Sequence, residues 1–132
     1  ADVPVLQLSL ARAYSAEQHV TLAQRLAPLR AQGVLVLGSG NVTHNLRQLS
    51  AGGTPPWAMA FDAAVSDAIS RRDIAALADY ARLPGAVLAV PTPEHYWPLL
   101  YVMAMCLPDE PVLQFNTGFD WGSISMRSVR AG

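Results

Sequence analysis

The sequence contains no lysine: its nine basic residues are all arginine, and charged residues make up only 14% of the 132 positions. The absence of lysine excludes Schiff-base catalysis and any phosphate-binding loop that depends on a lysine. An average soluble domain carries about 25% charged residues. A low charge together with 52% hydrophobic residues favours a largely buried α/β chain or a piece of something larger, and it excludes disorder.

A single cysteine, Cys106, leaves no disulfide framework and no thiolate zinc site, which fits a reducing cytoplasm. Long apolar runs are also missing, because Pro98 and Pro108 bracket the most hydrophobic one, which is shorter than the roughly 20 residues that a membrane helix needs. The formal net charge of −1 comes with no basic patch. We therefore expect a cytoplasmic protein without nucleic-acid or membrane partners.

Short apolar runs predict strands that are buried on both faces. Residues 3–10 (VPVLQLSL) and 34–37 are apolar at nearly every position, as in strands of a parallel sheet. Between them, Ser15 and Gln18 form a capping-box pattern, leucines follow at helical spacing, and Gly33 ends the helix. This order of strand, helix and strand indicates a βαβ unit.

The rest of the chain continues the alternation. We predict helices at about residues 59–70 and 73–81, a buried strand at 86–90, a helix from Thr92 onward, and closing strands at 112–117 and 123–129. The expected fold is a single α/β domain with a mostly parallel or mixed sheet flanked by helices. Because the sequence opens within a predicted strand and without an initiator methionine, we expect it to be the later half of a longer polypeptide.

The three histidines can be weighed one by one. His19 lies on the first turn of the first predicted helix, where we expect an exposed or half-buried side chain. His44 and His95 each follow the carboxyl end of a predicted buried strand, which is the edge where open α/β sheets bind their ligands. We therefore expect these two imidazoles to converge on one site.

His44 and His95 each have a functional and a structural interpretation. An imidazole can take and return a proton near neutral pH, and Asn41 and Asn45 can fix the tautomer of His44 or bind a polar substrate. A place in the first turn of a helix favours the neutral, metal-binding form of His95, and Glu94 can serve as a carboxylate ligand. A purely structural interpretation is equally open: His44 can hydrogen-bond only within its own turn, and His95 can pack on Tyr96. Glu94 can simply interact favourably with the helix dipole.

Other polar residues have structural explanations. A solvated helix face accounts for the four aspartates of the predicted helices: Asp62, Asp67, Asp73 and Asp79. The aromatic and methionine side chains of residues 96–105 are expected in the core, and Cys106 is expected to be an inert buried thiol. Gly38-Ser39-Gly40 matches neither the hydrolase nucleophile elbow nor the dinucleotide-binding fingerprint.

Three segments of the chain, in this order, resemble the class III extradiol ring-cleavage dioxygenases, and above all their DOPA 4,5-dioxygenase branch. They are SGNVTHNL (39–46), PTPEHYWPLLY (91–101) and GSISMRSV (122–129), and the opening VPVLQLSL also resembles a strand of that family. The resemblance runs over essentially the whole chain. It implies a non-haem metal, Fe(II) for catalysis with zinc as an alternative occupant after purification, that opens a catechol with O2 next to its two hydroxyls.

Carried onto this sequence, the resemblance implies that residues 1–132 form the carboxyl-terminal half of the catalytic domain. His95 matches a metal-ligand position, and His44 matches the active-site histidine that acts in acid–base catalysis close to the metal. Asn41, Asn45 and Glu94 are candidates for contact with these groups or with the substrate. The family's first two metal-binding histidines have no counterpart here, so we expect a missing amino-terminal half or a partner chain to supply them.

Two other classes of function stay open at this point. One is a non-catalytic fragment or association module with an incomplete metal site, which would bind no iron under any reconstitution. The other is a zinc-dependent hydrolase built on the same pair of histidines, which would act without consuming oxygen.

Overall fold

The first helix, α1 (Ala16–Leu26), begins where the sequence carries its capping box. In the computed structural model, which describes residues 2–132, the Gln18 N–H donates to the Ser15 hydroxyl and the Ser15 N–H donates to the Gln18 side chain. These two bonds satisfy backbone donors that the first turn of a helix leaves free. The 3-10 helix η1 (Ala27–Gln32) extends α1 and ends at Gly33, whose φ of 81° only glycine adopts readily.

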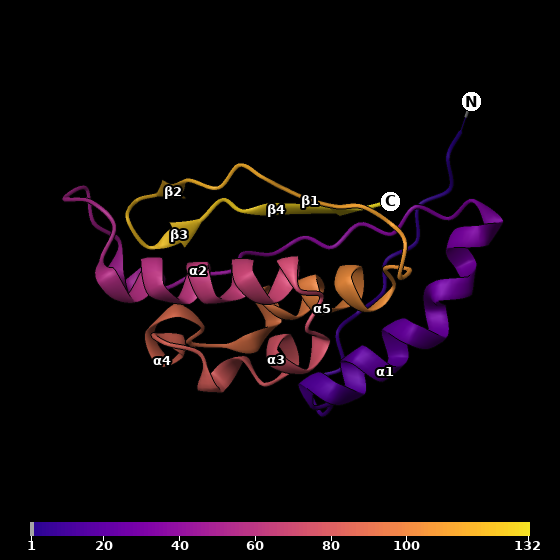
Figure 1. Ribbon diagram of the computed structural model, residues 1–132, viewed down its shortest axis with the longest axis horizontal. Helices are drawn as coiled ribbons and strands as arrows, with labels where there is room; N and C mark the ends of the chain where they lie inside the picture. The colour runs from indigo at the N-terminus through magenta and orange to yellow at the C-terminus, as the bar shows by residue number, and fades with distance from the viewer. Residues whose placement is uncertain (1) are drawn as a thin grey trace.

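Four further helices form the body of the molecule: α2 (Pro56–Ser70), α3 (Ile74–Ala78), α4 (Ala86–Ala89) and α5 (Trp97–Ala104). The short 3-10 helices η2 (Leu46–Gln48), η3 (Tyr80–Arg82) and η4 (Pro93–His95) lie between or before them. Figure 1 shows α2 above α3 and α4, with α5 behind them and α1 at one side. None of the helices in residues 2–132 combines the length and the apolar character needed to cross a membrane.

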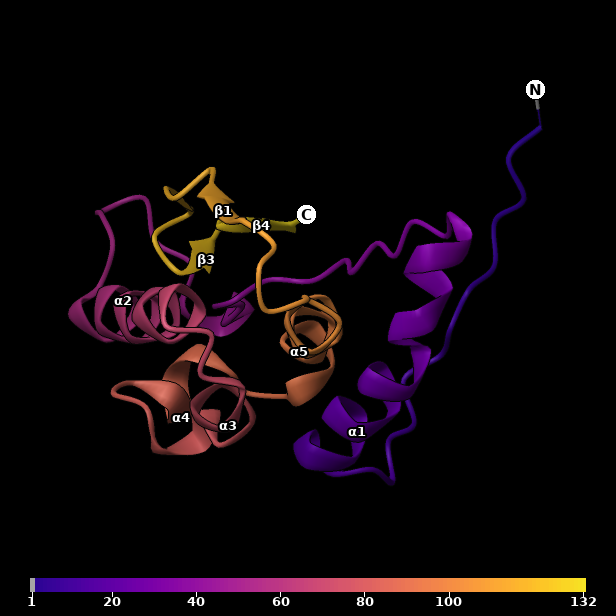
Figure 2. The same ribbon diagram turned by 45° about the vertical axis from the view of Figure 1, so that its right-hand side comes forward.

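The strands form two antiparallel pairs on the side of α2 that faces away from α3 and α4 (Figures 1 and 2). In one pair, β1 (Val112–Phe115) runs beside β4 (Ser128–Ala131), with the first residue of β1 opposite the last of β4. In the other, β2 (Phe119–Asp120) pairs with β3 (Ile124–Ser125). A separate bridge joins Ile124 of β3 to His44, and it brings the first predicted site residue to this small sheet.

The main core lies between α2, α4 and α5. Phe61, Val65 and Ile69 recur at four-residue spacing on α2 and are fully buried, as are Leu100 of α5 and Leu77 of α3. Each such side chain contributes about 1.5–3 kcal/mol through burial. A second cluster, which joins α1 to α5, contains Ala23, Tyr101 and Met105. These contacts hold α1, the most lateral helix, to the centre of the molecule.

The α/β class and the single domain are confirmed, but the predicted parallel strands do not form. Residues 3–10 and 34–37 have no strand partners among residues 2–132. Most of their apolar side chains are accordingly exposed, with Leu6 96% and Leu35 89% accessible, while Leu10 and Val36 are partly buried. An apolar run of this kind becomes a strand only beside another strand, and the paired strands of this chain come from its last quarter.

The strand predicted at residues 86–90 is also wrong, because that segment forms α4. A short apolar run fits a buried helix as well as a buried strand, and periodicity does not separate the two. The helix follows Gly85, whose φ of 80° turns the chain away from an extended path. The predicted helix from Thr92 is shorter than expected as well, since η4 ends at His95 and the α-helical part begins at Trp97.

Asp62 is buried, which corrects the prediction that it lies on a solvated face. Asp62 is 4% exposed. Its carboxylate accepts hydrogen bonds from Arg127 Nε at 3.0 Å, from Arg127 Nη2 at 2.5 Å and from the Ser125 hydroxyl at 2.6 Å. The bonds of Asp62 thus connect α2 to β3, through Ser125, and to the residues before β4, through Arg127. Asp67, in contrast, makes an exposed ion pair with Arg71, in agreement with the prediction.

Replacing Asp62 by Ala should therefore lower the free energy of unfolding by about 3–5 kcal/mol, because Arg127 would be left as a buried charge with no carboxylate to neutralise it. Urea unfolding followed by circular dichroism measures this change. The matched control is Asp67→Ala, which breaks an exposed pair and should cost about 0–1 kcal/mol. Equal effects of the two substitutions would contradict this role for Asp62.

Candidate active site

The segment that carries His44 is held from two sides. On one side, the His44 N–H donates to the Ala89 carbonyl at 3.0 Å, and Asn45 Nδ2 donates to the Leu88 carbonyl at 2.8 Å. On the other, Asn41 Nδ2 donates to the Ser125 carbonyl at 3.0 Å. Backbone groups that would be costly to bury alone are paired in this way, so the segment has a fixed position between α4 and β3.

Thr43 fastens the same segment more tightly to β3. Its hydroxyl donates to the Ser123 carbonyl at 2.8 Å and accepts from the Ser125 N–H at 2.8 Å. The Ser123 hydroxyl in turn donates to the Asn45 carbonyl at 2.9 Å. Thr43 and both serines are essentially inaccessible to solvent. The residues on either side of Thr43 thus have little freedom to move, His44 included.

His44 is 7% exposed, and its two ring nitrogens have different surroundings. Nε2 lies 2.8 Å from the Thr92 carbonyl, which only accepts, so Nε2 carries the hydrogen. Nδ1 therefore has a free lone pair, and no residue among 2–132 donates to it. Burial lowers the pKa of His44, and the neighbouring His95 lowers it further, although the Thr92 carbonyl acts in the opposite direction.

His95 lies at the end of η4 with its ring beside that of His44. The ring centroids are 5.0 Å apart and the ring planes meet at 54°. The two histidines come from segments separated by a large part of the chain, and the backbone also connects them, because the Asn41 N–H donates to the His95 carbonyl at 2.9 Å. The prediction that the two imidazoles converge is therefore met, with His95 exposed at the surface of the pair.

Glu94 is exposed and close to both histidines. Its carboxylate accepts from the Thr92 hydroxyl at 2.8 Å. Its pKa is lowered by a bond to its own backbone, by the bond from Thr92 and, more weakly, by His95 and His44. The carboxylate is thus ionised and within electrostatic reach of the pair. The expected cap from Thr92 to the helix backbone is absent, since the Thr92 side chain bonds to Glu94 instead.

The amides of Asn41 and Asn45 are engaged in the scaffold. Each Nδ2 donates to a backbone carbonyl, and the Asn45 Oδ1 also accepts from the Arg47 N–H at 3.1 Å. Among residues 2–132, no cluster of three or more histidine, cysteine, aspartate or glutamate side chains is arranged to hold a metal ion. The structure therefore gathers two imidazoles and one nearby carboxylate, which is less than a full ligand set.

His19 is fully buried, whereas we expected it exposed or half-buried. Its Nδ1 lies 2.8 Å from the Tyr101 hydroxyl, and its ring centroid is 4.4 Å from that of Trp97. The spacing of His19 to Ala23 and Leu26, at four and seven residues, places it on the buried stripe of α1 and was the signal that could have located it. It packs α1 against α5, away from the His44–His95 pair.

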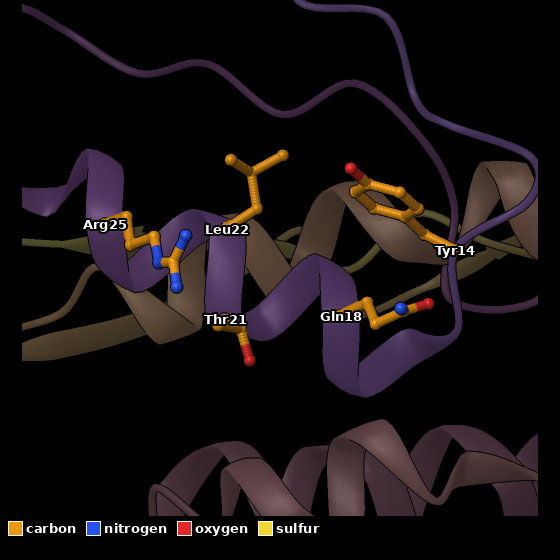
Figure 3. A pocket seen from close by; sticks show the side chains of 5 residues that line it. All are labelled: Tyr14, Gln18, Thr21, Leu22 and Arg25. Atoms are coloured by element: carbon orange, nitrogen blue, oxygen red, sulfur yellow. The ribbon is translucent and has the colours of Figure 1, made fainter.

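A surface pocket runs along α1, as Figure 3 shows. Its lining side chains are Tyr14, Gln18, Thr21, Leu22 and Arg25. Neither histidine of the pair lines it, so the geometry of this pocket says nothing about the chemistry of His44 and His95.

Fold and site together define an α/β domain that presents two contacting imidazoles, one of them with a buried free lone pair. The family described as "Catalytic LigB subunit of aromatic ring-opening dioxygenase" matches residues 1–114, a range that contains both histidines. The chain belongs to this family.

Individual relatives agree with that assignment. The chain is 38% identical over 138 aligned positions to a protein of Escherichia coli (strain K12) named "4,5-DOPA dioxygenase extradiol", which covers 100% of this chain and 51% of the relative. A protein of Beta vulgaris with the same name is 35% identical, covering 98% of this chain and 50% of its own length. The chain thus spans about half the length of the curated relatives it matches.

A solved structure extends the likeness to three dimensions. The crystal structure of an uncharacterized protein from Escherichia coli K12 superposes with a TM-score of 0.79 at 36% sequence identity. The superposition covers 89% of this chain and 50% of that chain. The arrangement of helices and strands described above is therefore found in an experimentally determined relative.

The buried position of His19 predicts a pH-dependent stability. Burial lowers its pKa from the ordinary value of 6.5, against a weaker opposing effect of the Ala11 carbonyl. Below that value the unfolded chain binds more protons than the folded one, so the free energy of unfolding should fall as the pH drops, by up to about 1.4 kcal/mol per pH unit.

Urea titrations between about pH 7.5 and about pH 5.5 measure this slope. The variant His19→Gln should show a shallower slope, with the remainder coming from His44. Gln24→Ala, on the exposed face of α1, serves as the control and should retain the slope of the unmodified chain. An unchanged slope in His19→Gln would show that His19 does not titrate in this way.

Proposed function

We propose that this chain supplies part of the active site of a metal-dependent extradiol dioxygenase, which opens the ring of a catechol such as DOPA with O2. The observation that carries the proposal is the contact between His44 and His95, with ring centroids 5.0 Å apart, inside the region that matches the ring-opening dioxygenase family. Residues 1–132 would then be the carboxyl-terminal half of the catalytic domain. A cytoplasmic location stays a prediction from the single cysteine.

The donor set fits one side of a metal site. His95 offers an exposed imidazole, and beside it His44 holds a buried, unpaired Nδ1 whose single lone pair can bind a metal or accept a proton, but not both at once. Neutral imidazoles suit Fe(II) and zinc alike, so we propose Fe(II) for catalysis and accept zinc as an occupant after purification. The chemistry that Fe(II) supplies in such a site is the activation of O2 and of a chelated catechol. Glu94 is a further candidate ligand.

His44 is well placed to move a proton. Its lowered pKa keeps the ring neutral near pH 7, and the bond from Nε2 to the Thr92 carbonyl fixes the direction in which Nδ1 points. A neutral Nδ1 next to a catechol hydroxyl can accept its proton and later return it, which is general acid–base catalysis. Asn41 and Asn45 contribute indirectly, because their amides hold the segment that carries His44.

Further ligands have to come from outside residues 2–132, and the unpaired segments suggest how. Residues 3–10 and 34–37 expose apolar side chains in runs that are typical of strands in the middle of a parallel sheet. We propose that strands from polypeptide outside this chain pair with them and bring the remaining metal-binding histidines. The share of the relatives that this chain covers, about half, supports this arrangement.

The alternative is a non-catalytic association module. The incomplete donor set among residues 2–132 is the observation that favours it. It differs from the proposal in one measurable property: under no reconstitution with further polypeptide would such a module bind iron or consume O2 in the presence of a catechol.

His95→Ala should abolish retention of the metal in the complete enzyme, because the exposed imidazole is the ligand that matches the family's position. Elemental analysis of iron and zinc after gel filtration measures the loss. Glu94→Gln is the matched neighbour: loss of metal there too would make Glu94 a ligand, and full retention would make it a bystander. Unchanged iron content in His95→Ala would contradict the assignment of His95 as a metal ligand.

His44→Ala should slow ring cleavage by roughly 100- to 10,000-fold, the range typical of a lost acid–base group. Oxygen uptake with DOPA as substrate measures the rate. Because His44 is buried, the control is a variant of similar burial outside the pair, Val42→Ala, which separates loss of catalysis from loss of packing. A fully active His44→Ala enzyme would contradict the proposed role.

A further inference from the structure

The two histidine-bearing segments cross each other at Gly40. The segment before His44 passes directly over the backbone from His95 to Pro98, and the Asn41 N–H bonds to the His95 carbonyl at 2.9 Å at the crossing. A Cβ atom built on Gly40 would lie 2.0 Å from the His95 carbonyl oxygen and 3.0 Å from its carbonyl carbon. One on Gly38 would lie 2.8 Å from the Pro98 carbonyl oxygen.

Space, and not backbone conformation, is the reason for these glycines. The glycines with positive φ are Gly33, Gly53, Gly85, Gly122 and Gly132, a set that contains neither Gly38 nor Gly40. Any residue could therefore adopt the backbone conformation at Gly40, but a side chain there would collide with main-chain atoms. Main-chain atoms cannot turn aside as the end of a flexible side chain can, so the collision has to move a segment.

The size of that movement follows from the contact distance. Real Cβ atoms essentially never approach another heavy atom closer than 3.0 Å, whereas a Cβ at Gly40 would meet the His95 oxygen at 2.0 Å. The two segments would have to separate by about 1 Å, the difference between these two values. The His44 side is anchored by Thr43 and Asn45 to β3 and α4, so the displacement falls on the junction with His95.

We infer that Gly40 is a positioning residue that sets the separation between the His44 and His95 rings. The catalytic importance of this separation rests on the proposed function, whereas the separation itself is a property of this chain. A glycine at the crossing allows the close approach, and the Asn41–His95 hydrogen bond fixes it. A methyl group at this position would part the rings even though it touches neither of them.

The test is Gly40→Ala, read out by the through-space NMR cross-peak between the ring protons of His44 and His95 in the protein without metal or substrate. Three histidines in the sequence make the ring signals simple to assign. We expect the cross-peak to fall by at least half, because its intensity decreases with the inverse sixth power of the proton separation. Gly118→Ala is the matched control, since its Cβ would meet nothing within 4 Å and its φ is ordinary.

A merely structural role would lower the melting temperature and leave the cross-peak of the folded molecules unchanged, so an undiminished cross-peak in Gly40→Ala overturns the inference. If Gly40→Ala does not fold, Gly38→Ala decides, because its milder overlap is with the backbone of Pro98, three residues beyond His95 in the same crossing. A weakened cross-peak there supports the inference, and an undiminished one overturns it.

The same variants also separate this inference from the proposed function. In an enzyme that cleaves catechols, a displacement of about 1 Å should lower kcat by about 100-fold in Gly40→Ala. A protein that cleaves no catechol at all would contradict the proposed function, yet the ring cross-peak would still decide the role of Gly40. A weakened cross-peak with an unchanged kcat would confirm the geometry and show that catalysis does not depend on it.

Discussion

The need to satisfy buried backbone hydrogen bonds governs the centre of this structure. The segment from Gly40 to Asn45 is neither a helix nor a member of a regular sheet, so its polar groups need partners elsewhere. They find them in β3 on one side and in the residues around α4 on the other. These bonds fix the position of the His44 backbone and the orientation of its ring. The Asn41–His95 bond brings the second imidazole to the same place. Without this double support the two rings would belong to unrelated surfaces.

The support continues inward as a chain of charged and polar contacts. The Ser125 N–H donates to the Thr43 hydroxyl, and the Ser125 hydroxyl donates to Asp62. Asp62 in turn forms an ion pair with Arg127. A buried ion pair adds little net stability compared with apolar residues of the same volume, but it tolerates only one geometry. Its place beneath the histidine-bearing segment suggests that precision of position is what it contributes. The position of the candidate site thus depends on the buried Asp62–Arg127 ion pair as well as on apolar packing.

The sequence predicted the parts of the molecule that depend on local chemistry. The capping box at Ser15, the end of η1 at Gly33 and the existence of a helix near residues 59–70 follow from side chains within a few residues of each other. The convergence of His44 and His95 was also predicted, although through a parallel sheet that residues 2–132 do not form. The burial of Asp62 was missed because an aspartate at one helix position gives no hint of an arginine near the other end of the chain.

The two predicted strands at residues 3–10 and 34–37 failed for a related reason. Their composition is right for a strand, but strand formation depends on a partner that composition does not reveal. Residues 86–90 show another limit, since a short apolar run fits a helix as well as a strand, and the turn at Gly85 before them favours a helix. For the two unpaired runs the missing information is the identity of a strand partner, whereas for residues 86–90 it is the conformation of the preceding glycine.

The exposed apolar runs also bear on how the protein reaches its final form. An unpaired extended segment rich in valine and leucine is a template to which any other extended chain can add, its own copies included. The helices and strand pairs of the remaining residues pack around the main core and the second cluster, to which the runs add the partly buried Leu10 and Val36. Residues 3–10 and 34–37 are therefore the segments at which aggregation of the isolated chain would begin.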